Sequence, residues 1–136
     1  MKAYTNLEQS RKLAEILPLE SADGFYESIL NPTTKEWNGI LVTGTEWASP
    51  EVVTPAWSLA ALMNIFPKEE GSCTSLSFGY YDANGGYYRN YIRAWLCCYE
   101  KEGESTDDYI IETIPADNPI DACVAMILKL KERNLL

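Results

Sequence analysis

Histidine is missing from this chain, and cysteine occurs only four times, at Cys73, Cys97, Cys98 and Cys123. Without histidine there is no Ser-His-Asp triad and no Cys-His pair for nucleophilic catalysis. No two cysteines form a C-x-x-C motif, and a structural zinc site needs four soft ligands at workable spacing. A G-x-x-x-x-G-K-[ST] phosphate loop is also missing. The sequence therefore predicts no metal site, no cofactor and no catalytic residue set.

Long apolar runs are absent as well. The longest uncharged run covers residues 52–67 and includes two prolines, whereas a helix that crosses a bilayer needs about 20 apolar residues. The first residues, MKAYTN, lack the apolar core of a signal peptide. We therefore expect a cytoplasmic protein with reduced thiols and no membrane partner.

Positive charge is scarce: 11 Lys and Arg stand against 20 Asp and Glu, which gives a net charge of −9. Such a field repels nucleic-acid phosphates and anionic membranes, so we expect no nucleic-acid partner. The acidic excess indicates either solubility alone or a basic partner. With 136 residues, 46% hydrophobic and 23% charged, the composition predicts one globular domain over residues 1–136.

Two of three expected helices lie at the ends of the chain. Thr5 and Glu8 are spaced as a capping box, which predicts a helix over residues 6–17 that ends before Pro18. Asn118 as N-cap and Pro119 at the first helical position predict the last helix. Its expected buried stripe contains Ile120, Val124, Ile127 and Leu130, with Cys123 beside it.

The middle helix is expected to begin with Thr54 as N-cap and Pro55 as its first residue, and to end at Pro67. Trp57, Leu59, Leu62, Met63 and Phe66 recur along it, and it carries no charge. A helix that is apolar on most sides is buried on most sides. Burial within one subunit and partial burial in an oligomer interface both remain open.

About five strands are expected. Residues 25–30 and 36–42 flank an Asn31-Pro32 turn and predict a hairpin, residues 51–54 suggest a short extended piece, and residues 74–82, 87–99 and 109–114 predict further strands. The fold class is α+β, an antiparallel sheet of about five strands with three helices in the order α-β-β-α-β-β-β-α.

Residues 87–99 hold the strongest pattern. Period-two alternation separates an apolar face from an aromatic and cationic face. A three-residue loop at residues 84–86 would pair Phe78 with Ile92 and Leu76 with Ala94, which keeps apolar residues together. The length of the strand predicts a bend or bulge near Asn90 or at Cys97-Cys98.

The aromatic and cationic face is the candidate interaction site. It consists of Tyr87, Arg89, Tyr91, Arg93 and Trp95. Aromatic rings beside arginine stabilise a sheet, but single-stranded nucleic-acid platforms also use them. Packing against a helix, a surface for a protein partner or self-association, a small-ligand site and a nucleic-acid surface are the alternatives.

Thiol and carboxylate groups offer a second, weaker set of candidates. In the expected register Cys73 lies opposite Cys97, where a cross-strand disulfide is conceivable, but a cytoplasmic location favours two thiols. Cys98 and Cys123 are expected as small core residues. The acids of residues 100–108 are expected in a solvated loop, with loose binding of a divalent cation as the alternative.

Three segments are familiar together: residues 6–14 (NLEQSRKLA) with 17–23 (LPLESAD), residues 55–62 (PAWSLAAL), and residues 118–136, which begin NPIDA. In these segments the chain resembles small uncharacterised proteins of prophages and mobile elements in gut bacteria. The resemblance implies a phage or mobile-element origin, and it implies no activity. The sequence as a whole predicts a non-enzymatic adaptor or accessory protein that binds a protein partner or itself. The rival hypothesis is a ligand binder or an enzyme that uses a carboxylate or thiol site.

Overall fold

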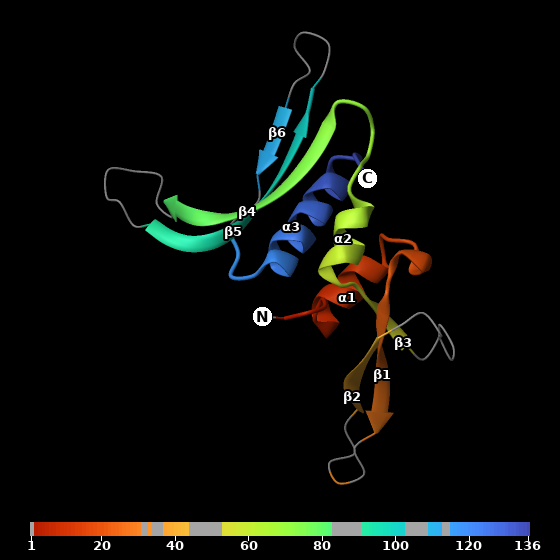
Figure 1. The fold of residues 1–136 in the computed structure, drawn as a ribbon. Helices are drawn as coiled ribbons and strands as arrows, with labels where there is room; N and C mark the ends of the chain where they lie inside the picture. The colour runs from red at the N-terminus through yellow and green to blue at the C-terminus, as the bar shows by residue number, and fades with distance from the viewer. Residues whose placement is uncertain are drawn as a thin grey trace. The chain divides into compact units, whose positions relative to one another are not determined.

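The computed structural model describes residues 2–30, 33, 37–43, 53–82, 91–102, 109–112 and 115–136. They form three α-helices, one 3-10 helix and six strands (Figure 1). The chain divides into two compact units, Lys2–Ile65 and Phe66–Leu136, and each contains one antiparallel three-stranded sheet. The prediction that residues 1–136 form a single domain stays a prediction.

The N-terminal unit is built on a hairpin. Strand β1 (Gly24–Leu30) pairs along its whole length with β2 (Trp37–Thr43), and its other edge pairs with β3 (Val53–Ala56). The hairpin predicted from residues 25–30 and 36–42 is therefore confirmed. The predicted turn at Asn31-Pro32 lies outside the described residues.

Helix α1 (Leu7–Ala14) begins one residue later than its capping signal suggested. Asn6 is the N-cap: its Oδ1 accepts from the Gln9 backbone N–H at 2.8 Å, and Gln9 Oε1 accepts from the Asn6 N–H at 3.0 Å. The expected Thr5–Glu8 box is wrong, because the Thr5 side chain is fully buried. A short 3-10 helix, η1 (Leu19–Ser21), follows Pro18.

Helix α2 (Leu59–Ile65) is shorter than expected, and the prediction of Thr54 as N-cap and Pro55 as first residue is wrong. Both residues belong to β3, where Pro55 pairs with Phe25 of β1. Proline is tolerated there because β3 is an edge strand of this sheet. The cap is Ser58, whose Oγ accepts from the Ala61 N–H at 3.2 Å.

A buried polar network stabilises the N-terminal unit around Trp57, whose side chain is fully buried. The Trp57 backbone N–H donates to Thr5 Oγ1 at 3.2 Å, and Thr5 Oγ1 lies 2.7 Å from Ser10 Oγ. The indole N–H of Trp57 donates to Ser21 Oγ at 2.9 Å. These buried polar atoms are therefore satisfied within the unit, as buried polar groups generally are.

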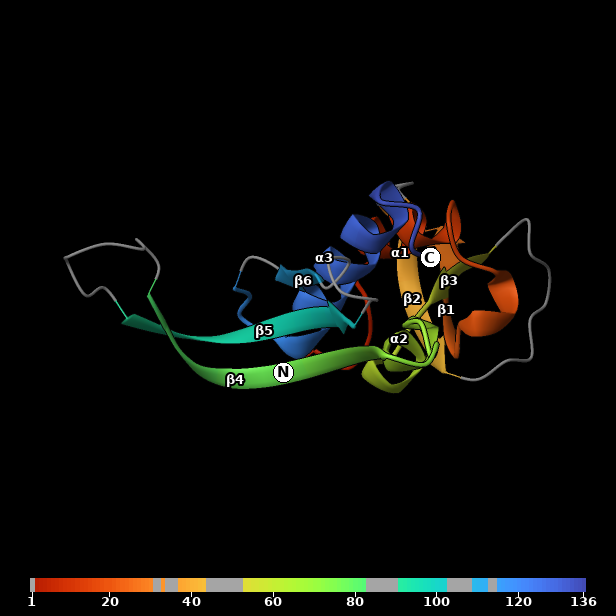
Figure 2. The same cartoon turned by 90° about the horizontal axis from the view of Figure 1, so that it is seen from above.

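The C-terminal unit places β5 (Tyr91–Lys101) between β4 (Ser72–Asp82) and the shorter β6 (Tyr109–Glu112). Strands β4 and β5 form a long curved ribbon, with β4 at the edge of the sheet (Figure 2). Helix α3 (Pro119–Glu132) packs on β5. It begins as predicted: Asn118 Oδ1 accepts from the Asp121 N–H at 2.9 Å, and the expected stripe of Ile120, Val124, Ile127 and Leu130 is buried.

The predicted register of β4 and β5 is wrong. Phe78 pairs with Trp95 and not with Ile92, and Leu76 pairs with Cys97 and not with Ala94. This change moves Phe78 to the aromatic and cationic face, where ring contacts replace the expected apolar pairing. The pairing runs without a bulge from Ser72–Lys101 to Asp82–Tyr91, and residues 83–90, which include the predicted loop, lie outside the described part.

The α+β character, the three helices and the antiparallel pairing agree with the prediction. Two points differ: the described strands make two separate sheets, and the short piece before the middle helix is the strand β3. Within the described residues, no helix combines the length and apolar character needed to cross a membrane.

Candidate interaction surface

The five residues predicted as an interaction site are described to different extents. Tyr87 and Arg89 lie outside the described residues, and only the backbone of Tyr91 is described, opposite Asp82. Arg93 and Trp95 are described in full, on the same face of β5. The structure therefore addresses the C-terminal part of the predicted site.

Arg93 and Trp95 each face an aromatic residue of β4. Tyr80 lies opposite Arg93, and Phe78 lies opposite Trp95. The Arg93 guanidinium carbon is 5.3 Å from the ring centroid of Phe78 and 5.6 Å from that of Tyr80. The rings of Phe78 and Trp95 have centroids 5.0 Å apart. Phe78, Tyr80, Arg93 and Trp95 thus form one cluster, which we call the Arg93 surface.

This face of β5 changes from surface to core along the strand. Arg93 is exposed and Trp95 is half-buried, whereas Cys97 and Tyr99 are fully buried. The hydrogen bond between the Cys97 and Cys123 thiols identifies α3 as the element that covers the buried end. Packing against a helix therefore accounts for Cys97 and Tyr99. It leaves Phe78 48% and Tyr80 73% exposed.

Among the residues whose side chains the structure describes, no carboxylate lies within ion-pair distance of Arg93; the side chain of Asp82 is outside that part. Ion pairs are seen elsewhere, for example between Lys12 and Glu8 and between Lys101 and Glu69. Arginine over an aromatic ring keeps its N–H donors available in the plane of the guanidinium. The Arg93 surface thus presents a cation with unused donors between two exposed rings.

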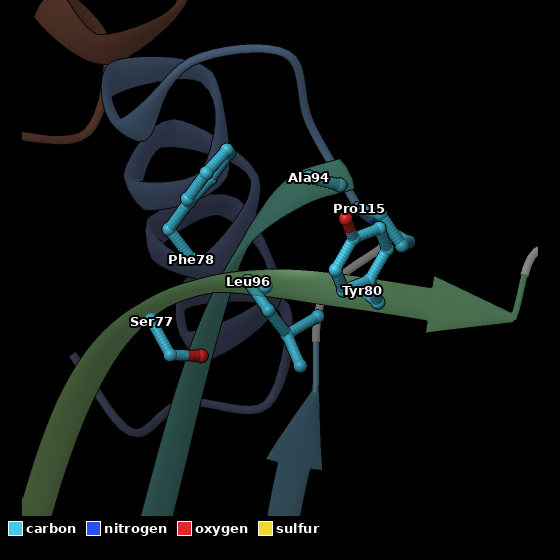
Figure 3. Close-up of a pocket in the computed structure, with 7 residues that line it drawn as sticks. Ser77, Phe78, Tyr80, Ala94, Leu96 and Pro115 are labelled. Carbon is cyan, nitrogen blue, oxygen red and sulfur yellow. The ribbon is translucent and has the colours of Figure 1, made fainter. Parts of the chain in front are cut away.

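A shallow depression of about 100 Å³ (Figure 3) is lined mainly by residues whose side chains belong to the sheet face opposite the Arg93 surface. Ser77, Gly79, Ala94, Leu96 and Pro115 line it together with Phe78 and Tyr80. It forms where Gly79 lies opposite Ala94, because neither residue carries a large side chain. Drug-sized ligands occupy pockets of about 300–1,000 Å³, so this depression suits one protruding side chain better than a ligand.

The thiols do not form an accessible site. Cys97 and Cys123 are both fully buried, and all four cysteines are free. The hydrogen bond to Cys123, together with burial, raises the pKa of the Cys97 thiol. The Cys97 thiol therefore stays protonated, and its S–H donates a hydrogen bond to the Cys123 sulfur in the core. The expected opposition of Cys73 and Cys97 is wrong, because Cys73 faces Glu100.

The acidic loop predicted at residues 100–108 lies mostly outside the described residues. In the part that is described, no three Asp, Glu, Cys or His side chains come close enough to hold a metal ion. Loose binding of a divalent cation by that loop stays a prediction.

Phe78 and Tyr80 are the site residues that sequence reasoning missed. They were assigned to the opposite face from Arg93, because a short loop was used to set the register. The signal that could have found them is the alternation Leu76, Phe78, Tyr80 against Ser75, Ser77, Gly79. All the large residues share one face of β4, and Arg93 and Trp95 lie on the same face of the sheet. Comparison with protein families, curated proteins and solved structures finds no match to this chain.

Proposed function

We propose that this protein is a protein-interaction module and that its partner binds on the Arg93 surface. The observation that carries the proposal is the position of the Arg93 guanidinium between the exposed rings of Phe78 and Tyr80. No carboxylate among the described side chains lies within ion-pair distance of it. Arginine and large aromatic residues are enriched among the residues that dominate binding energy at protein interfaces.

The chemistry of the surface specifies the kind of partner. A carboxylate of the partner would bind to the Arg93 N–H donors, and an apolar side chain next to it would cover the exposed rings of Phe78 and Tyr80. The partner side therefore combines an acidic residue with an apolar one.

The rival function, an enzyme or ligand binder with a thiol or carboxylate site, receives less support from the described residues. Their two fully buried cysteines contact each other in the core, and the depression beside Phe78 is small. We include in the proposal the role of an adaptor or accessory protein of phage or mobile-element type, which rests on the resemblance of three sequence segments. Cytoplasmic location is part of the same proposal.

Affinity capture with matched variants tests the proposal. The wild-type protein, Arg93→Ala and Arg11→Ala serve as baits in lysate of cells that carry the gene, and each captured protein is then purified. Arg11 is an exposed arginine of α1 and controls for the loss of one positive charge. We expect Arg93→Ala to weaken binding of the purified partner at least tenfold in calorimetry, which corresponds to about 1.4 kcal/mol. A partner that binds both variants and the wild type equally would refute the assignment of the surface.

A further inference from the structure

Strand β4 forms an edge of its sheet over its whole length. The order of the sheet is β4-β5-β6, and β4 pairs with β5 from Ser72 to Asp82. On its other side, no strand of the described residues pairs with it. An unpaired strand edge presents backbone N–H and C=O groups that can pair with another strand.

Three hydrogen bonds identify the residues of β4 whose backbone N–H and C=O groups point outward. The N–H and C=O of Trp95 both bond to Ala116, away from β4, so the pair Phe78–Trp95 is not hydrogen-bonded. The Glu102 N–H donates to the Gly71 C=O at 2.8 Å, which fixes the hydrogen-bonded pairs at the odd-numbered residues of β4. By alternation, the even-numbered residues of β4 direct their backbone groups to the free edge.

The free part of this edge has clear limits. Ser72 is already used, because its N–H donates to the Glu69 C=O at 3.0 Å. Beyond it, Thr74, Leu76, Phe78 and Tyr80 have no backbone partner at this edge among the described residues. Asp82 also faces this edge, but it ends the strand with a charged residue. The uncharged free stretch therefore runs over residues 74–80, and its centre is Ser77.

This stretch lacks the features that usually prevent unwanted strand pairing. Edge strands are commonly protected by lysine, proline, inward charges or a bulge. Residues 72–81 contain no proline and no charged residue, and the pairing with β5 has no bulge. The edge is thus open to a second strand.

We propose that a second copy of this chain occupies the edge, with the two β4 strands antiparallel about a two-fold axis at Ser77. This register uses every outward-facing residue of the uncharged stretch, because that stretch is centred on Ser77. It sets Leu76 opposite Phe78 of the second copy and Thr74 opposite Tyr80 of the second copy. The two sheets then form one continuous sheet.

The side chains and the charge of residues 74–80 are compatible with pairing to a second copy of this chain. On one face the pairing joins apolar residues, Leu76 with Phe78, and such cross-strand pairs are favourable. On the other face it joins only small residues, since Ser75 meets Gly79 and Ser77 meets Ser77 of the second copy. The chain carries a net charge of −9, but the paired stretch itself has no charge. Self-pairing therefore brings no like charges together within the strand contact.

This inference goes beyond the proposed function. It uses the backbone edge of β4, whereas the Arg93 surface uses side chains on one face. The pairing leaves Arg93 accessible and places the Leu76 of one copy beside the Phe78 of the other.

An engineered disulfide tests the register. In Ser77→Cys, made in a Cys73→Ser background, the two introduced cysteines would face each other in a non-hydrogen-bonded pair with Cα atoms about 4.5 Å apart, within the range of about 4.4–6.8 Å for disulfides. We expect a covalent dimer on a non-reducing gel after mild oxidation. The wild type is the matched control: its exposed Cys73 lies on the same face of β4 as residue 77, and we expect no covalent dimer from it. In this register two Cys73 residues would be about 26 Å apart, too far to link.

Sedimentation velocity over a concentration series gives the second measurement. We expect a reversible dimer for the wild type. For Ser77→Lys we expect a dissociation constant about two- to fivefold higher, because two like charges placed directly opposite each other destabilise a strand pair by about that factor. Ser75→Lys has the same charge on the same exposed face but faces Gly79 of the second copy, so it should dimerise like the wild type. A strict monomer at high concentration, or a dimer equally strong in both lysine variants, would overturn the inference.

The two proposals fail in different ways. If Ser77→Cys stays monomeric while a captured partner still requires Arg93, the edge inference is wrong and the proposed function stands. In the opposite case, the Ser77→Cys variant forms the covalent dimer with or without Arg93→Ala, and no captured partner needs Arg93 for binding. The edge pairing then stands, and the assignment of the Arg93 surface is wrong.

Discussion

Phe78 and Trp95 face each other across β4 and β5 with their ring centroids 5.0 Å apart and their planes inclined by 41°. This geometry lies between the stacked and edge-to-face arrangements that aromatic pairs favour. Because the pair joins the exposed part of the Arg93 surface to its half-buried part, it couples the surface to the stability of the C-terminal unit.

The first prediction concerns this pair. We expect a double-mutant cycle with Phe78→Leu and Trp95→Leu to give a coupling energy of about 0.5–1.5 kcal/mol in urea denaturation, as for other aromatic pairs. The control cycle combines Tyr80→Leu with Trp95→Leu, whose rings are not in contact in the structure, and should give coupling near zero. Equal coupling in the two cycles would contradict the observed register.

The second prediction concerns the buried hydroxyl of Thr5. Thr5→Val keeps the shape of the side chain but removes the oxygen that accepts from the Trp57 N–H and contacts Ser10. A buried donor left without a partner costs about 1–3 kcal/mol, so we expect that loss in the free energy of unfolding. Thr5→Ser keeps the hydroxyl and should lose less, and a larger loss for Thr5→Ser than for Thr5→Val would contradict the network.

The third prediction compares two glycines in strands. A Cβ at Gly24 would lie 2.8 Å from Tyr4 Cε1 and 3.3 Å from the Val42 carbonyl oxygen. We expect Gly24→Ala to lose about 1–3 kcal/mol, the usual range for overpacking. Gly79→Ala meets open space and should be neutral or gain up to about 0.5–1 kcal/mol, because alanine has less backbone freedom to lose. Thermal or urea unfolding of both variants measures the difference.

The fourth prediction concerns the thiols. Cys73 is exposed, whereas Cys97 and Cys123 are fully buried. Since the hydrogen bond to Cys123 and burial raise the pKa of Cys97, that thiol should stay protonated and unreactive in the native protein at neutral pH. We expect a thiol reagent to label Cys73 quickly, and Cys97 and Cys123 only after denaturation. Peptide mapping by mass spectrometry identifies the labelled residues, and Cys73→Ser should remove the fast phase.

The fifth prediction concerns alkaline pH. Burial raises the pKa of Tyr26 above its ordinary value of 10.0, and its hydroxyl donates to the Thr5 C=O at 2.7 Å. Above pH 10 the unfolded chain loses this proton before the folded protein does. The free energy of unfolding should therefore fall as the pH rises from 10 through the raised pKa.

Urea denaturation at a series of alkaline pH values measures this slope. The Tyr26→Phe variant has no phenol at this position, so its stability should depend less steeply on pH in the same window. Tyr4, whose pKa burial and the nearby charge of Asp23 also raise, supplies a residual slope in both proteins. Identical slopes for the variant and the wild type would contradict the prediction for Tyr26.

The start of the last helix could be predicted from the sequence because its signal is local, whereas the capping box of the first helix was misplaced by one residue. Asn118 and Pro119 fix the start of α3 with atoms of the same turn. Thr54 and Pro55 have the same local signature but form a strand, because β1 offers them a hydrogen-bonding partner from a distant part of the chain. Local propensity is a weak guide where such a partner is present.

Only part of the candidate site could be predicted from the sequence, because only part of its pattern is local to one strand. Alternation within β5 identified Arg93 and Trp95 as neighbours on one face, because that pattern needs only one strand. Phe78 and Tyr80 depend on how two strands are aligned, and a shift by an odd number of residues exchanges the faces of a strand. Burial of Cys97 and Tyr99 depends on where α3 lies, which no pattern within β5 contains.

The unprotected edge of β4 has a consequence for handling the protein. The net charge that keeps molecules apart disappears near the isoelectric point of about 4.4, and an open edge without charged residues can then pair with strands of other molecules out of register. Mild acid should therefore bring fibrous or amorphous precipitation that begins at residues 74–80. A lysine at Ser77 would serve as a solubilising substitution for purification and crystallisation.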